Sequence, residues 1–178
     1  PGVVKNGRHG GNSFIVGEAL PGMADPARAS AIATELSGSL FTCSASPDIR
    51  RAMWVKLVRN VAGSPICSLT QSSLTAAYSD PDLRQLAIAL MNEATAVGAA
   101  HGFDCLAADP QADVAAAAKL RHKPSMLQDL ELGRPMEIDS QLAIVRDFAR
   151  QGGVATPTLE RLLPILMLRA RTAGSYPA

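Results

Sequence analysis

The sequence predicts a mainly α-helical fold that follows a short segment containing β-strands. The first observation is the composition: 47% of the 178 residues are hydrophobic but only 4% are aromatic, so Ala, Leu, Val and Ile have to form the core. Chains of this kind pack most readily as helices. The second observation is a succession of helix-start signals from Pro47 onward, and the third is that Val- and Ile-rich runs typical of strands gather near the start of the chain.

A β-hairpin is expected at the start of the chain. The apolar runs Gly2–Val4 and Ser13–Glu18 flank the turn-forming residues 5–12. This Gly-rich turn is not a phosphate loop, because it lacks G-x-G-x-x-G spacing, does not end in Lys-Ser or Lys-Thr, and leads into a strand instead of a helix.

A helix and a strand should follow the hairpin. Asp25 can accept the free N–H groups of a helix that begins at Pro26, runs to about Leu36 and stops at Gly38. A strand is expected at Leu40–Cys43, which gives the order β-β-α-β. Elements this small cannot form a core of their own, so we expect them to complete a sheet whose other strands are missing from the chain.

The remainder of the chain is expected to be helical. Helix starts are marked by Ser, Asp or Thr close to Pro, and helix ends by Gly. The expected helices are 47–62, 80–102, 109–120, 125–132, 138–151 and a last one that starts at Thr156-Pro157 and fades by Gly174. Pro164 should kink the last helix, because proline removes a backbone hydrogen bond from a helix interior.

Charge, cysteine and histidine usage exclude several classes of function. The formal net charge is +1 and the basic residues form no block, so no nucleic-acid partner is expected. Cys43, Cys67 and Cys105 form no C-x-x-C pair, which is typical of reduced thiols. The histidines show no metal-ligand spacing, so no metal site is expected.

The chain shows no targeting or membrane segment. No apolar run has membrane-spanning length and no signal peptide is present, so we expect a soluble, cytoplasmic protein without a membrane partner. The chain opens on Pro1 within an apolar segment and not on methionine, which indicates a fragment that enters partway through a fold.

A row of polar residues follows one side of the expected helix 47–62. Lys56, Asn60 and Ser64 are spaced four residues apart, which stacks them along the helix. One interpretation is a solvated polar stripe. The other is a row that faces a cleft and offers one proton donor and two hydrogen-bonding groups.

A second polar cluster lies between residues 124 and 139. Here Ser125 could be an N-cap that forms a capping box with Gln128. Glu137 and Asp139 could then be first-turn acids that the helix dipole favours. This structural interpretation accounts for most of the cluster without a function.

Three motifs in this order resemble the ketopantoate reductases (2-dehydropantoate 2-reductases). Residues 54–60 resemble the W-x-K-L-x-x-N helix of that family. Residues 125–129, followed by Gly-Arg at 133–134 and Glu-Ile-Asp at 137–139, resemble its second signature. Residues 153–157 resemble its G-V-x-T-P turn, and the opening strands resemble the end of its Rossmann domain.

The resemblance implies part of a two-domain enzyme that reduces ketopantoate to pantoate in pantothenate and coenzyme A biosynthesis. Residues 1–46 would close the NADPH-binding Rossmann domain, whose cofactor site is mainly upstream. Residues 47–178 would form a helical domain of the 6-phosphogluconate-dehydrogenase C-terminal-like type, for substrate binding and dimerisation. In the family, hydride passes from NADPH to the keto carbon of a 2-oxo acid while a lysine protonates the oxygen.

The resemblance also implies a role for each matching residue. Lys56 would be the general acid and Asn60 would hold the substrate. Ser125 would bind the carboxylate end of the substrate, while Glu137 would bind its hydroxyl and help orient the lysine. Because the G-x-G-x-x-G fingerprint is absent, we expect no turnover by this chain alone.

Two positions depart from the family pattern. Ser64 and His122 stand where asparagine is common, and both positions contact substrate in the family. One alternative is therefore a related dehydrogenase for another 2-oxo or hydroxy acid. The other is a non-catalytic helical module that forms a homodimer through an apolar face such as 159–168.

Overall fold

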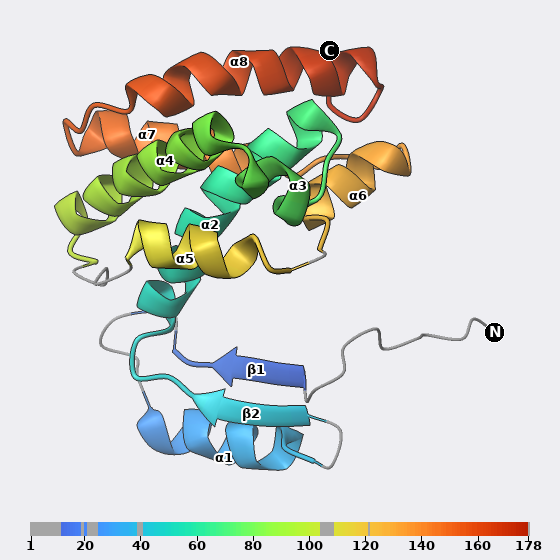
Figure 1. Ribbon diagram of the computed structural model, residues 1–178. Helices are drawn as coiled ribbons and strands as arrows, with labels where there is room; N and C mark the ends of the chain where they lie inside the picture. Colours follow the sequence, from blue (N-terminus) through green and yellow to red (C-terminus); the bar gives the residue numbers. More distant parts are fainter. Residues whose placement is uncertain are drawn as a thin grey trace. The chain divides into compact units, whose positions relative to one another are not determined.

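The computed structural model describes residues 12–18, 20, 25–38, 41–103, 109–120 and 122–177 (Figure 1). It divides into two compact units, residues 1–53 and 54–178. The division falls within helix α2 (Ile49–Thr70). Within the described residues, no helix combines the length and the apolar character needed to span a membrane.

The first unit contains a two-stranded parallel sheet and one helix. Strand β1 (Asn12–Val16) pairs with β2 (Phe41–Ala45), and α1 (Pro26–Leu36) connects them. The Asp25 carboxylate accepts hydrogen bonds from two backbone N–H groups of α1, which confirms the predicted cap. The first strand of the expected hairpin lies outside the described residues, and β1 takes β2 as its partner.

Both faces of this small sheet leave apolar side chains exposed. Phe14 and Ile15, adjacent in β1 and therefore on opposite faces, are 53% and 54% exposed. The Phe14 ring packs edge-on against that of Phe41. Parallel sheets are normally covered on both faces, so this pair of strands has the character of part of a larger sheet.

The second unit is helical, as the composition predicts. The elements after α2 are α3 (Leu74–Ser79), α4 (Pro81–Ala100), α5 (Pro110–Ala117), α6 (Ser125–Glu131), the π-helical turn η1 (Asp139–Ala143), α7 (Ile144–Gln151) and α8 (Pro157–Thr172). Asp80 and Asp109 cap α4 and α5 with their carboxylates. Helix α3 was not predicted, and the expected single helix 138–151 begins instead with a π-turn.

Helix α2 extends well beyond its predicted end at residue 62. Pro65 lies inside it and has no N–H to donate to the carbonyl of Val61. The helix nevertheless continues to Thr70 because Ala62, Ile66 and Cys67 are at most 1% exposed and contribute to the core. Burial of these side chains offsets the lost hydrogen bond. Likewise, α8 continues through Pro164.

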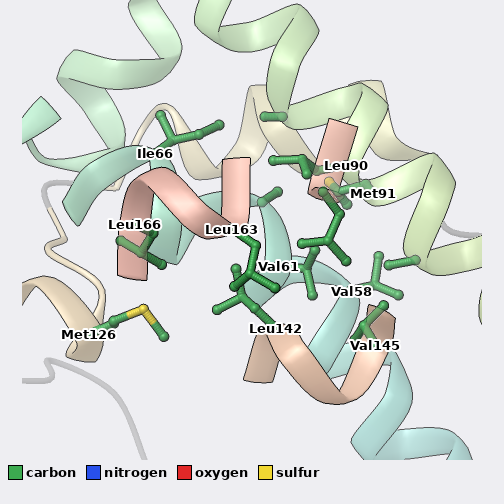
Figure 2. Close-up of a cluster of buried hydrophobic side chains, with 14 of the residues drawn as sticks. Val58, Val61, Ile66, Leu90, Met91, Met126, Leu142, Val145, Leu163 and Leu166 are labelled. Atoms are coloured by element: carbon green, nitrogen blue, oxygen red, sulfur yellow. The ribbon is translucent and has the colours of Figure 1, made fainter. Parts of the chain in front are cut away.

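Side chains from most helices of the second unit meet in one core (Figure 2). The labelled side chains come from α2, α4, α6, η1, α7 and α8, and all are buried: Val58, Val61, Ile66, Leu90, Met91, Met126, Leu142, Val145, Leu163 and Leu166. Trp54 and Tyr78 are the buried aromatic residues of this core among the described residues.

The N-terminus of α8 is capped by a side chain from another helix. The carboxylate of Glu93 in α4 accepts hydrogen bonds from the N–H groups of Thr158 (2.8 Å) and Leu159 (3.0 Å). The hydroxyl of Thr156, the residue in the cap position, is buried without a partner among the described residues. Glu93 therefore does for α8 what an N-cap residue does within its own helix.

We predict that Glu93→Ala lowers the free energy of unfolding by about 1–3 kcal/mol, because two partly buried N–H groups lose a charged acceptor. Chemical denaturation of the chain, followed by circular dichroism, measures this. The matched control is Glu160→Gln, which removes a charge from the first turn of α8 and should cost at most about 1 kcal/mol. Equal losses in the two variants would show that the Glu93 contact is only a general charge effect.

Candidate active site

Helix α2 places the predicted polar row along a gradient of burial. Lys56 is exposed, Asn60 is half-buried and Ser64 is 2% exposed. The three residues are one helical turn apart, so the row runs from solvent into the core. A purely solvated stripe would not end in a buried serine, so the row is not solvated along its whole length.

Lys56 differs from the neighbouring arginine in its contacts. Arg59 donates from Nε (3.2 Å) and from the guanidinium end (3.1 Å) to the carboxylate of Asp113 in α5. Among the residues that the structure describes, Lys56 has no ion pair or side-chain hydrogen bond. Its ammonium group is therefore available to a ligand, whereas Arg59 is occupied.

Glu137 lies on the segment between α6 and η1. The flanking residues Met136 and Ile138 are buried, while Glu137 itself is exposed. Its carboxylate accepts a hydrogen bond from Nε2 of Gln141 (2.7 Å), four residues further on. The structure therefore pairs Glu137 with Gln141 and not with Lys56.

Ser125 and His122 lie at the start of α6, and the predicted capping box is wrong. Pro124 occupies the N-cap position and Ser125 is the first helical residue, with its side chain exposed. The side chain of Gln128 donates instead to the backbone carbonyl of Lys123 (2.7 Å). The hydroxyl of Ser125 is consequently not used as a cap. The backbone carbonyl of His122 accepts from the N–H of Leu74 (3.0 Å), and the His122 side chain is exposed.

The predicted site residues thus lie on α2, at the start of α6 and before η1. No hydrogen bond or ion pair joins any two of them in the described structure. Within the same residues, no group of His, Cys, Asp and Glu could hold a metal ion. Sequence reasoning missed Gln141 as the partner of Glu137, although their spacing of four residues was a usable signal.

The buried cysteine Cys67 offers no nucleophile. Cys43 and Cys67 are free thiols, and Cys105 lies outside the described residues. Burial raises the pKa of Cys67 to about 12. The thiol therefore stays protonated at neutral pH and serves packing in the core.

Comparisons with known proteins agree on one family. Residues 48–170 match the family described as ketopantoate reductase PanE/ApbA, C-terminal. A 2-dehydropantoate 2-reductase from Mesorhizobium japonicum is 35% identical over 176 residues, which are 99% of this chain and 53% of the relative. The chain spans about half the length of the curated relatives that it matches.

Solved structures show the same fold. A 2-dehydropantoate 2-reductase from Geobacter metallireducens is 30% identical with a TM-score of 0.78, over 85% of this chain and 51% of that one. A D-mandelate dehydrogenase solved with NADH and anilino(oxo)acetate is 21% identical with a TM-score of 0.74, over 83% of this chain and 49% of that one. The second likeness concerns the fold alone.

Proposed function

The chain belongs to the ketopantoate reductase family, and from this we propose that it is the substrate-binding part of an NADPH-dependent enzyme that reduces 2-dehydropantoate to pantoate. The observation that supports this most is Lys56: it lies on the helix within the matched region, is exposed and has no partner among the described side chains. A free ammonium group in a family site is the proton donor that carbonyl reduction requires.

Each site residue then has a chemical task. Bound NADPH would supply the hydride. Lys56 stabilises the negative charge on the substrate oxygen and gives it a proton. Asn60 and the unused hydroxyl of Ser125 hold the substrate, the latter at its carboxylate end. Glu137 binds the hydroxyl of the substrate.

We also propose that residues 1–46 are the end of the nucleotide-binding domain and residues 47–178 the substrate-binding domain. The half-exposed Phe14 and Ile15 on a two-stranded parallel sheet support this, because further strands and helices would cover them. The chain alone then lacks most of the cofactor site and has no turnover. We use the name complete enzyme for this chain with a full nucleotide-binding half restored upstream.

A homodimer and a cytoplasmic location are part of the same proposal. Ile165 and Leu168 on α8 are 57% and 65% exposed, which gives the helix an apolar outer surface that a second subunit could cover. The dimeric ketopantoate reductase of Staphylococcus aureus shares the fold at 20% identity.

A dehydrogenase for another 2-oxo or hydroxy acid is the second candidate. Ser64 and His122 favour it, because a serine hydroxyl is shorter than an asparagine amide and has one donor hydrogen instead of two, and because a histidine ring differs from the amide in shape. Ser64 is also 2% exposed, so a shorter side chain at this position changes the space at the inner end of the row.

A substrate panel separates the candidates. We predict that the complete enzyme oxidises NADPH with 2-dehydropantoate, and that NADH, pyruvate and phenylglyoxylate give lower kcat/KM. The change of absorbance on cofactor oxidation measures this, with the chain alone as the inactive control. The second candidate would be established if the complete enzyme preferred another acid and the double substitution Ser64→Asn with His122→Asn shifted that preference toward 2-dehydropantoate.

Two outcomes contradict the proposal. NADPH oxidation by the chain alone, above a Lys56→Ala control, would show that the cofactor site is not mainly upstream. Full activity of the complete enzyme after neutralisation of both Lys56 and Glu137 would favour the non-catalytic helical module.

A further inference from the structure

The end of the chain folds back onto the segment that carries Glu137. The N–H of Met136 donates to the carbonyl of Ser175 (2.8 Å), and the hydroxyl of Tyr176 donates to the carboxylate of Asp139. The two contacts therefore lie on either side of Glu137, one residue before it and two residues after it. Residues 174–177 thus fix the backbone from which the Glu137 side chain projects.

The tail itself is firmly placed. Gly174, with a φ of 71°, ends α8 in a left-handed turn, and the N–H of Ser175 returns to the carbonyl of Ala170 (2.9 Å). Ser175 is 1% exposed. The Arg171 guanidinium lies 5.5 Å from the centre of the Tyr176 ring and donates from Nε to the carbonyl of Pro177 (3.1 Å).

The Tyr176 hydroxyl can donate its hydrogen bond over a wide range of pH. The hydrogen bond to Asp139 raises the pKa of Tyr176 above its ordinary value, so the proton remains on the phenol at neutral and mildly alkaline pH. Asp139 is the first residue of the π-turn η1. The bond therefore ties the tail to the start of the element whose third residue, Gln141, holds the Glu137 carboxylate.

Three contacts surround Glu137. Its own carboxylate is bonded to Gln141, and the tail is bonded to the backbone of Met136 before it and to the side chain of Asp139 after it. Each of these hydrogen bonds depends on the geometry of residues 136–141. Turns of this π-helical kind are frequent at functional sites.

We propose that Tyr176 is a positioning residue for Glu137: its hydrogen bond to Asp139 fixes the segment that presents the Glu137 carboxylate to the substrate hydroxyl. The inference rests on the proposed function of Glu137. Tyr176 contacts no substrate itself, so it acts on binding through Glu137 and leaves proton donation by Lys56 in place.

The test is a double-mutant cycle in the complete enzyme with Tyr176→Phe and Glu137→Gln. Tyr176→Phe should raise KM for the 2-oxo acid about fivefold or more with kcat changed less than about twofold, because small misplacements of a contacting group are costly. In the Glu137→Gln background the same change should alter kcat/KM less than about 1.5-fold, because the two residues act as one unit. Thr172→Val is the matched control: it removes a hydroxyl that is bonded to the Leu168 carbonyl within α8.

The outcomes are distinguishable. If Tyr176→Phe leaves KM unchanged while Glu137→Gln is impaired, the role of Tyr176 is overturned and that of Glu137 is kept. The same holds if Tyr176→Phe lowers kcat/KM by the same factor with and without Glu137→Gln. A Glu137→Gln enzyme with wild-type kcat/KM overturns the proposed role of Glu137 and this inference with it. If Tyr176→Phe lowers the melting temperature, Asp139→Ala and Asp139→Asn replace it: the asparagine retains an acceptor for Tyr176 and should restore KM.

Discussion

Lys56→Ala is expected to lower kcat of the complete enzyme by about 100- to 10,000-fold, the usual contribution of a positioned general acid. Reduction of a carbonyl creates negative charge on oxygen, and the ammonium group of Lys56 both stabilises that charge and donates a proton. Because the interaction is strongest in the transition state, kcat and kcat/KM should fall together. Steady-state rates of cofactor oxidation measure the effect.

Further variants distinguish the effect of losing the proton donor from the effect of losing the positive charge. Lys56→Arg keeps the positive charge but holds its proton too tightly to donate it, so substrate affinity should survive better than kcat. Added ethylamine should partly restore the rate of Lys56→Ala, since it supplies an ammonium group to the vacated space. Lys119→Ala, which changes an exposed lysine of the same unit, should leave the rate unchanged. A Lys56→Ala enzyme that retains most of its kcat would contradict the account.

Trp54→Ala should lower the free energy of unfolding by about 3–5 kcal/mol, the range for loss of a large buried aromatic side chain. Trp54 is 5% exposed and donates from Nε1 to the carbonyl of Ala94 (3.1 Å). Its ring stacks on Phe103 at a centroid distance of 5.4 Å and meets Phe148 edge-on. A Cβ on Gly98 would lie 2.2 Å from Nε1, so the indole fills all the space that this glycine leaves.

Circular dichroism is the suitable measurement, because Trp54 is the only tryptophan in the sequence and its removal also removes the fluorescence probe. Met53→Ala is the control: Met53 is the preceding residue and 63% exposed, so its loss should change stability by less than about 0.5 kcal/mol. Similar losses in the two variants would show that the indole is not packed as the structure has it.

The sequence was most informative about the fold where local chemistry decides the structure. The carboxylates of Asp25, Asp80 and Asp109 each accept hydrogen bonds from the first turn of a helix that begins with proline, and this cap was predicted for Asp25. The errors arose where distant contacts decide. Helix α2 continues past Pro65 because the side chains that follow are buried in the core. The π-turn η1 has no local sequence signature.

In the candidate site, too, features set within one helix could be predicted and contacts between distant residues could not. The spacing of Lys56, Asn60 and Ser64 is a property of one helix and follows from the sequence. The bond from Tyr176 to Asp139 and the cap that Glu93 provides join residues far apart in the chain. No periodicity encodes such pairs, so they became visible only in three dimensions.

A crystal structure of the complete enzyme with NADP and pantoate bound would show whether Lys56 and Glu137 act on the same substrate molecule. These two residues have no contact with each other in the described structure. We expect the pantoate C2 oxygen within hydrogen-bond distance of the Lys56 Nζ atom, and the other hydroxyl of pantoate on the Glu137 carboxylate. Pantoate bound elsewhere, with Lys56 and Glu137 both facing solvent, would contradict it.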